Sequence, residues 1–150
     1  INISSISLNE NNYDVSIHHN NKNCTSNTNI HGLTIDNNSI YIKNNGYIPN
    51  GSEKSVLYQD NKIIVMNDNK SKIEPNLFID EYDVEASHGA YIGKFDEEEL
   101  FYLNSRGLDE NKCYELLING FLLNEFNITD DVKDDLKKII KKYWRWKNEL

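Results

Sequence analysis

The stretch DVEASHGAYIGKFDEEELFYLNSRGL, residues 83–108, decides the organisation of the chain, because the sequence pattern changes within it. Before it, short runs of Val, Ile, Leu and Tyr alternate with Asn-rich segments, which is typical of β-strands separated by turns. After it, apolar residues recur at helical spacing. The sequence therefore predicts a β-rich part over residues 1–93 and a helical part over residues 94–150.

The β-rich part contains eight apolar runs that predict short strands. They cover residues 3–8, 13–18, 32–35, 39–43, 55–59, 62–66, 76–80 and 83–87. Asn, Asp, Gly and Pro predict turns at residues 36–38, 44–46, 49–51 and 60–61. A sandwich or barrel gives this pattern, and so does a β-solenoid, in which each strand stacks on the next coil. Because no clean repeat period is legible, the pattern alone slightly favours the sandwich.

Three helices are predicted after residue 93. Asp96 is a good N-cap with Glu99 three residues later, and Gly107 is a natural end for the first helix. Asp109 caps the second helix and Thr129 the third. The apolar face of the second helix is formed by Cys113, Leu116, Leu117, Gly120 and Phe121. That of the third is Val132, Leu136, Ile139, Ile140 and Tyr143, one face of an α-helix.

Charge and composition exclude several classes of protein. The net charge is −8, and residues 71–150 carry 11 Lys and Arg against 18 Asp and Glu. Such a surface repels phosphate backbones, so we expect no nucleic-acid partner. Solubility or a basic protein partner explains the acidic charge better. The uninterrupted apolar runs, such as residues 121–123, are far too short to span a membrane. Cys24 and Cys113 lie in unlike contexts, which argues against a disulfide framework and indicates a reducing compartment. Because the sequence starts at Ile1, we expect a piece of a longer protein.

Few side chains suggest chemistry of their own. His18, His19, Cys24 and His31 fit no common zinc spacing, and adjacent histidines in a strand point to opposite faces. The acids at 96–99 are explained by the helix dipole, and Cys113 by the helix core. No nucleophile elbow or phosphate-binding Gly loop is present, so we expect no enzyme and no catalytic residue.

His88 is the residue whose role the pattern leaves open. A neutral imidazole suits iron, zinc or copper, yet a single histidine beside Gly89 can also be packed and hydrogen-bonded. The residues alone favour the packed histidine.

The opening stretch resembles the C-terminal region of the SufB/SufD family of iron–sulfur cluster assembly scaffold proteins, and within it the SufD type. The matching motifs are DV, SHGA and Gly93, then DEE at 96–98, LFYL at 100–103 and SRG at 105–107. The helix ENKCYELLINGFL, residues 110–122, is also similar. The likeness is looser at SIHHNNKNCTSN, residues 16–27, and at residues 60–80. SufB-type sequences tend to carry His-Glu in place of Ser-His-Gly.

The resemblance implies a right-handed parallel β-helix, of which residues 1–93 are the last coils, followed by a helical C-terminal domain. It implies that the β-helix pairs with a SufB-type subunit, or with a second copy, and that the helices bind the ATPase SufC. The partner-binding residues would be Leu100, Phe101, Leu103, Arg106, Leu117 and Phe121.

In this family a transient iron–sulfur cluster is formed between the paired subunits, and His88 stands at the position of a histidine ligand. Some members have Cys two residues before this histidine. Here that residue is Ala86, so a thiolate would come from the partner. The resemblance therefore implies no stable cofactor on this chain alone, and a cytoplasmic or plastid location.

Two other functions stay open at this point. A β-solenoid could bind or cleave carbohydrate, which would require a pair of carboxylates on one strand face. Asp80 and Glu81 are adjacent and so point to opposite faces, which makes them a poor pair. A purely structural interaction module could use the segment YWRWK, residues 143–147, as its anchor, since two Trp near a chain end need a surface to bury against.

Overall fold

A computed structural model describes residues 1–67 and 70–148, with side chains described up to residue 142 in the last helix. The chain divides into two compact units, Ile1–Lys94 and Phe95–Leu150. The first unit contains all seven strands and the second all three helices of the described chain. The segment YWRWK, residues 143–147, was predicted as an anchor, and its side chains lie outside the described part of the structure. The predicted independence of the two parts as domains stays a prediction.

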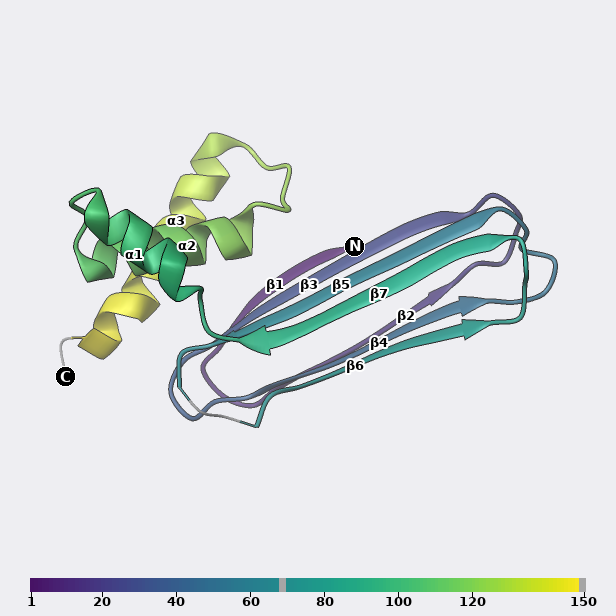
Figure 1. Cartoon of the computed structure of the whole chain (residues 1–150), viewed down its shortest axis with the longest axis horizontal. Coiled ribbons are helices and arrows are strands. Elements are labelled where there is room, and N and C mark those ends of the chain that lie inside the picture. Colours follow the sequence, from purple (N-terminus) through teal and green to yellow (C-terminus); the bar gives the residue numbers. More distant parts are fainter. Residues whose placement is uncertain (68–69, 149–150) are drawn as a thin grey trace. The chain divides into compact units, whose positions relative to one another are not determined.

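The strands form two parallel sheets, which Figure 1 shows running along the length of the first unit. Their bounds are β1 Asn2–Ser7, β2 Asn11–His18, β3 Thr25–Thr34, β4 Ile40–Ile48, β5 Ser55–Val65, β6 Lys72–Ile79 and β7 Val84–Gly93. One sheet has the order β1-β3-β5-β7 and the other β2-β4-β6, all pairs being parallel. The chain thus alternates between the sheets and builds a β-solenoid of about three turns.

The β-helix implied by the resemblance is confirmed, and the sandwich or barrel favoured by the pattern alone is wrong. Parallel pairing joins residues about one coil apart in the sequence, which local alternation cannot reveal. The coils also differ in length: Asn2 pairs with Asn29, Thr25 with Val56 and Ser55 with Val84. Unequal coils explain why no repeat period is legible.

Inside the solenoid, apolar and amide side chains share the interior. The apolar part centres on Ile30, Ile40, Ile42 and Ile63, each almost fully buried. The strands are also longer than predicted, since the run 55–59 and all but the last residue of the run 62–66 belong to the single strand β5. The turns predicted at 44–46 and 60–61 are wrong, because these residues lie within β4 and β5. The turns predicted at 36–38 and 49–51 do contain turn residues.

Two of the misassigned residues, Asn44 and Asn61, belong to an interior amide network that they make with Thr28 and Gln59. The Asn44 Nδ2 group donates to Thr28 Oγ1 and to Asn61 Oδ1, both at 2.9 Å. Asn61 Nδ2 in turn donates to the Gly89 carbonyl at 3.1 Å. Buried amides are tolerated in a strand interior when their donors and acceptors are paired in this way. Asn44 and Asn61 therefore make contacts between coils and do not form turns.

The helical unit follows the predicted caps closely. Helix α1, Glu97–Ser105, starts after Asp96, whose side chain accepts from the Glu98 amide. Helix α2, Glu110–Leu123, starts after Asp109, and helix α3, Asp130–Asn148, starts after Thr129. Gly107 has φ of 88°, the left-handed conformation that glycine adopts after a helix. The predicted apolar face of α2 is only partly buried, since Leu116 and Gly120 are exposed while Ile118 and Leu122 are buried.

Candidate functional site

The last coil of the solenoid has core-facing residues that no further described coil of the first unit covers. Strand β7 is at the edge of one sheet and β6 at the edge of the other. In the register of β5 and β7, the buried residues Ser55, Leu57, Gln59, Asn61 and Ile63 pair with Val84, Ala86, His88, Ala90 and Ile92. Paired residues in adjacent parallel strands face the same side, so these β7 residues point inward. His88, Ala90 and Ile92 are nevertheless exposed.

Strand β6 completes this open end. Ile73, Pro75, Leu77 and Ile79 continue the inward-facing rows of β4, and Ile79 is exposed. Pro75 lacks an amide donor, which suits a strand at a sheet edge. The open end is therefore a largely apolar surface of β6 and β7 residues with one imidazole, that of His88, among them.

The imidazole of His88 is accessible on the inward-facing side of β7. Its neighbours on the same face of β7 are Ala86 and Ala90, whose small side chains leave the imidazole accessible. Among the described residues, no group of three or more His, Cys, Asp and Glu side chains could hold a metal ion. One imidazole supplies one ligand, and an iron–sulfur cluster needs more, chiefly thiolates. His88 by itself therefore supplies too few ligands to hold such a cluster.

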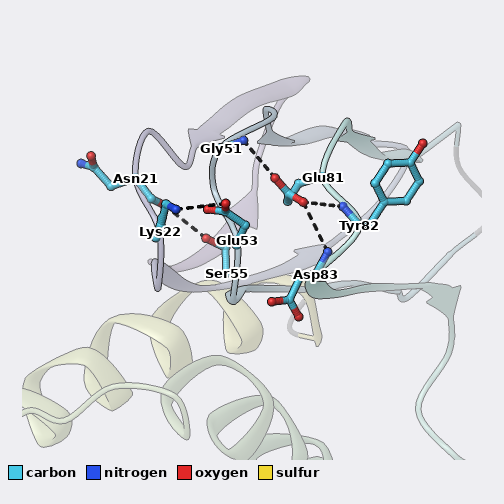
Figure 2. Close-up of polar contacts among 8 residues, drawn as sticks. All are labelled: Asn21, Lys22, Gly51, Glu53, Ser55, Glu81, Tyr82 and Asp83. Carbon is cyan, nitrogen blue, oxygen red and sulfur yellow. Dashed lines mark hydrogen bonds and ion pairs between the residues drawn. The ribbon is translucent and has the colours of Figure 1, made fainter.

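The turn before β7 is held by one carboxylate, as Figure 2 shows. Glu81 Oε2 accepts from the Gly51 amide at 2.9 Å, and Glu81 Oε1 accepts from the Tyr82 amide at 2.8 Å. These two hydrogen bonds, with a weaker one from the Asp83 amide, hold the pKa of Glu81 below its usual range. The turn is thereby tied to the previous coil, which fixes the start of the strand that carries His88.

The neighbouring acid at this corner is also engaged. Lys22 Nζ lies 3.0 Å from Glu53 Oε1, and this contact lowers the pKa of Glu53 (Figure 2). Glu81 and Glu53 thus hold turns together, which leaves them poorly suited as the acid and base of a glycosidase. Tyr82, by contrast, points away from these contacts and is 99% exposed.

The predicted division of the His18–His19 pair is confirmed. His18 is exposed and stacks on Tyr47 with ring centroids 4.2 Å apart, and Tyr47 stacks on Phe78 at 4.7 Å. His19 is buried, and its Nε2 lies 2.8 Å from Ser26 Oγ. Burial lowers the pKa of His19. These histidines are structural members of the coils.

The helical unit has an open hollow with a volume of about 370 Å³. Its lining residues are Asp96, Glu98, Glu99, Tyr102 and Leu103 from the start and middle of α1, and Leu117 from α2. Acidic side chains thus surround an apolar floor. Such a hollow suits an apolar side chain of a partner that is flanked by basic residues.

The six predicted partner-binding residues occupy different environments. Leu103 and Leu117 line the hollow, and Phe101 is 75% exposed on α1. Leu100 is half-buried, and the Arg106 guanidinium lies over the Tyr102 ring, 5.1 Å from its centroid. Phe121 is half-buried and makes an edge contact with Phe95 at 6.2 Å, which indicates a packing role inside the unit. The structure does not test their partner roles.

Two features of the site were not singled out by sequence reasoning. Tyr102 was quoted only as part of a motif, although it lines the hollow. Gln59 lies within an apolar run, and nothing in that run distinguishes it. Only the register shows that it is the strand neighbour of His88.

The fold and the exposed surfaces define a class of protein: a parallel β-solenoid with a histidine on its last strand, followed by a helical unit. The profile of the family described as SUF system FeS cluster assembly, SufBD core domain, matches residues 7–121. The chain belongs to this family, as its motifs predict. No helix among the described residues is both long and apolar enough to cross a membrane.

Individual relatives support the assignment. The SufD protein of Bacillus subtilis is 34% identical over 116 residues, which are 75% of this chain and 26% of that protein. A SufBD family protein of Pyrococcus horikoshii is 48% identical over 62 residues, 39% of this chain and 14% of the relative. The SufD protein of Escherichia coli is 36% identical over 62 residues, which are 41% of this chain and 14% of that protein. The chain spans about a quarter or less of the length of these relatives.

Proposed function

We propose that this chain is the C-terminal part of a non-catalytic scaffold subunit in iron–sulfur cluster assembly by the SUF system. In this proposal the open end of the solenoid pairs with a SufB-type subunit or with a second copy. His88 then contributes one ligand to a cluster that is assembled there as cargo. The helical unit binds a SufC-type ATPase.

One observation carries the proposal: residues that face the solenoid interior, His88 among them, are exposed at its last coil. Exposed apolar groups and unpaired strand edges are normally covered, by further chain or by a partner. A partner that extends both sheets would bury Ile79 and Ile92 and bring its own side chains toward His88. The family match, residues 7–121, spans this end and the first half of the helical unit, which supports placing both partner sites in this chain.

The alternative of a carbohydrate-binding or carbohydrate-active solenoid has less support. The acids near the open end include Glu81, whose carboxylate holds three backbone amides. The relatives named above are described as cluster assembly proteins and not as carbohydrate proteins. We therefore keep the scaffold role as the proposed function.

Ile92→Lys tests the pairing surface. Ile92 is 44% exposed at the open end, and a charge there would be desolvated by a second solenoid. We expect the variant to weaken pairing with a SufB-type subunit by at least about tenfold, since one buried unpaired charge costs more than 1.4 kcal/mol. Analytical ultracentrifugation of the full-length subunits measures this.

Val132→Lys is the matched control, because it adds the same charge to an exposed apolar residue of the helical unit. It should leave the pairing unchanged. Equal pairing by wild type and Ile92→Lys would remove the open end as the pairing surface.

A further inference from the structure

The contacts of the interior amide network determine which way each amide group points. They leave one acceptor beside His88, Gln59 Oε1, without a donor in the described chain. Its backbone anchors are the carbonyls of Gly89 and Asn76, which can only accept. Asn61 Nδ2 must therefore face Gly89, which turns Asn61 Oδ1 toward the Asn44 Nδ2 group. Asn44 Oδ1 is then left to accept from Gln59 Nε2 at 3.3 Å.

The orientation of the Gln59 amide follows from the same contacts. Its Nε2 group lies near three acceptors, the Asn44 carbonyl and Asn44 Oδ1 at 3.3 Å and the Asn76 carbonyl at 3.5 Å. A flipped amide would place an oxygen against three oxygens, so the nitrogen must occupy this position. The Gln59 Oε1 atom consequently points away from the network, and it is buried without a hydrogen-bond partner in the described chain.

A buried acceptor without a donor is unfavourable by about 1–3 kcal/mol, so a donor is expected nearby in the working state. Gln59 itself is only 3% exposed. Its register partner in the next strand is His88, on the same face of the sheet. Adjacent strands lie about 4.8 Å apart, so an imidazole N–H is within reach of the Gln59 oxygen after rotation of its side-chain torsions.

We infer that Gln59 is a positioning residue for His88: its Oε1 accepts one imidazole N–H and so leaves the lone pair of the other ring nitrogen for a ligand. The identity of that ligand rests on the proposed function, whereas the contact between Gln59 and His88 does not. Histidines that bind metals commonly donate their second N–H to an oxygen, which fixes the tautomer and the ring orientation. Because the hydrogen bonds of its Nε2 group hold the Gln59 amide in place, the Gln59 oxygen can fix the orientation of the His88 ring.

The test is nitrogen-15 NMR of the histidine-labelled chain at a pH where the imidazole is neutral, comparing wild type with Gln59→Met. Met keeps the length of the side chain and removes the acceptor. We expect one ring tautomer of His88 and a slowly exchanging ring N–H in the wild type. In Gln59→Met we expect a mixture of tautomers and fast exchange of the ring proton with water. Gln59→Asn, which retracts the amide by one methylene, should give the same loss if Gln59→Met does not fold.

Thr28→Val is the matched control. It removes a hydrogen bond from the same network one coil earlier, without touching the Gln59 oxygen. A purely structural role for Gln59 predicts that Thr28→Val and Gln59→Met lower the stability and leave the His88 tautomer unchanged, and that result would overturn the inference. Failure of the subunit to pair or to carry a cluster would count against the proposed function, while the tautomer result would stand by itself.

Discussion

Replacing Asn44 by Ala is expected to lower the free energy of unfolding of the chain by about 3 kcal/mol, a large effect for one residue. Asn44 is fully buried, and its amide joins Thr28 of β3 to Gln59 and Asn61 of β5 across the interior. Truncation leaves Asn61 Oδ1 without its donor, which costs about 1–3 kcal/mol, and it also leaves a cavity. Urea unfolding followed by circular dichroism measures the change.

The control is Asn27→Ala, which removes an exposed Asn of strand β3. That variant should stay within about 0.5 kcal/mol of the wild type, as surface substitutions usually do. Equal stability of the Asn44 and Asn27 variants would show that the interior amide network contributes little and that the solenoid is held by its Ile residues.

Replacing His88 by Ala is expected to reduce the cluster content of the assembled complex by more than about tenfold. Loss of a residue that only hydrogen-bonds to a metal ligand typically lowers metal affinity 10–100-fold, and loss of a ligand itself should lower it at least as much. His88 is exposed, so the free energy of unfolding should fall by no more than about 1–3 kcal/mol, the cost of leaving the buried Gln59 Oε1 without its donor. Iron and sulfide analysis of the complex purified without oxygen, together with its visible absorption, gives the readout.

Ser87→Ala is the control on the same strand, since successive strand residues point to opposite faces. It should keep the cluster. A His88→Ala complex with wild-type cluster content would mean that the imidazole is not a ligand, while a strongly destabilised variant would mean that His88 supports the last coil.

The helical unit was predictable from sequence to a degree that the solenoid was not. Asp96 and Asp109 act through hydrogen bonds to amides two or three residues away, so local sequence contains the whole signal. The solenoid depends on pairs such as Gln59 with His88, which lie a full coil apart. Only the family motifs around SHGA and SRG could indicate that architecture.

Asn is the residue type that local reasoning misassigned. Asn44 and Asn61 look like turn residues, because Asn readily adopts turn conformations. In the structure the Asn44 amide donates to side chains 16 and 17 residues away, and Asn61 donates to the Gly89 carbonyl of the next coil, all inside the strands. For the same reason the exposure of His88 could not be predicted, since it depends on whether another coil covers β7.

The measurement that tests the central claim most directly is calorimetric titration of the chain with its cognate SufC-type ATPase. The scaffold account predicts tight one-to-one binding. It also predicts that Phe101→Ala, which removes an aromatic ring 75% exposed on α1, keeps its fold and weakens binding by about tenfold or more. Absence of binding by a well-folded wild-type chain would contradict the account, leaving the family likeness as a likeness of fold alone.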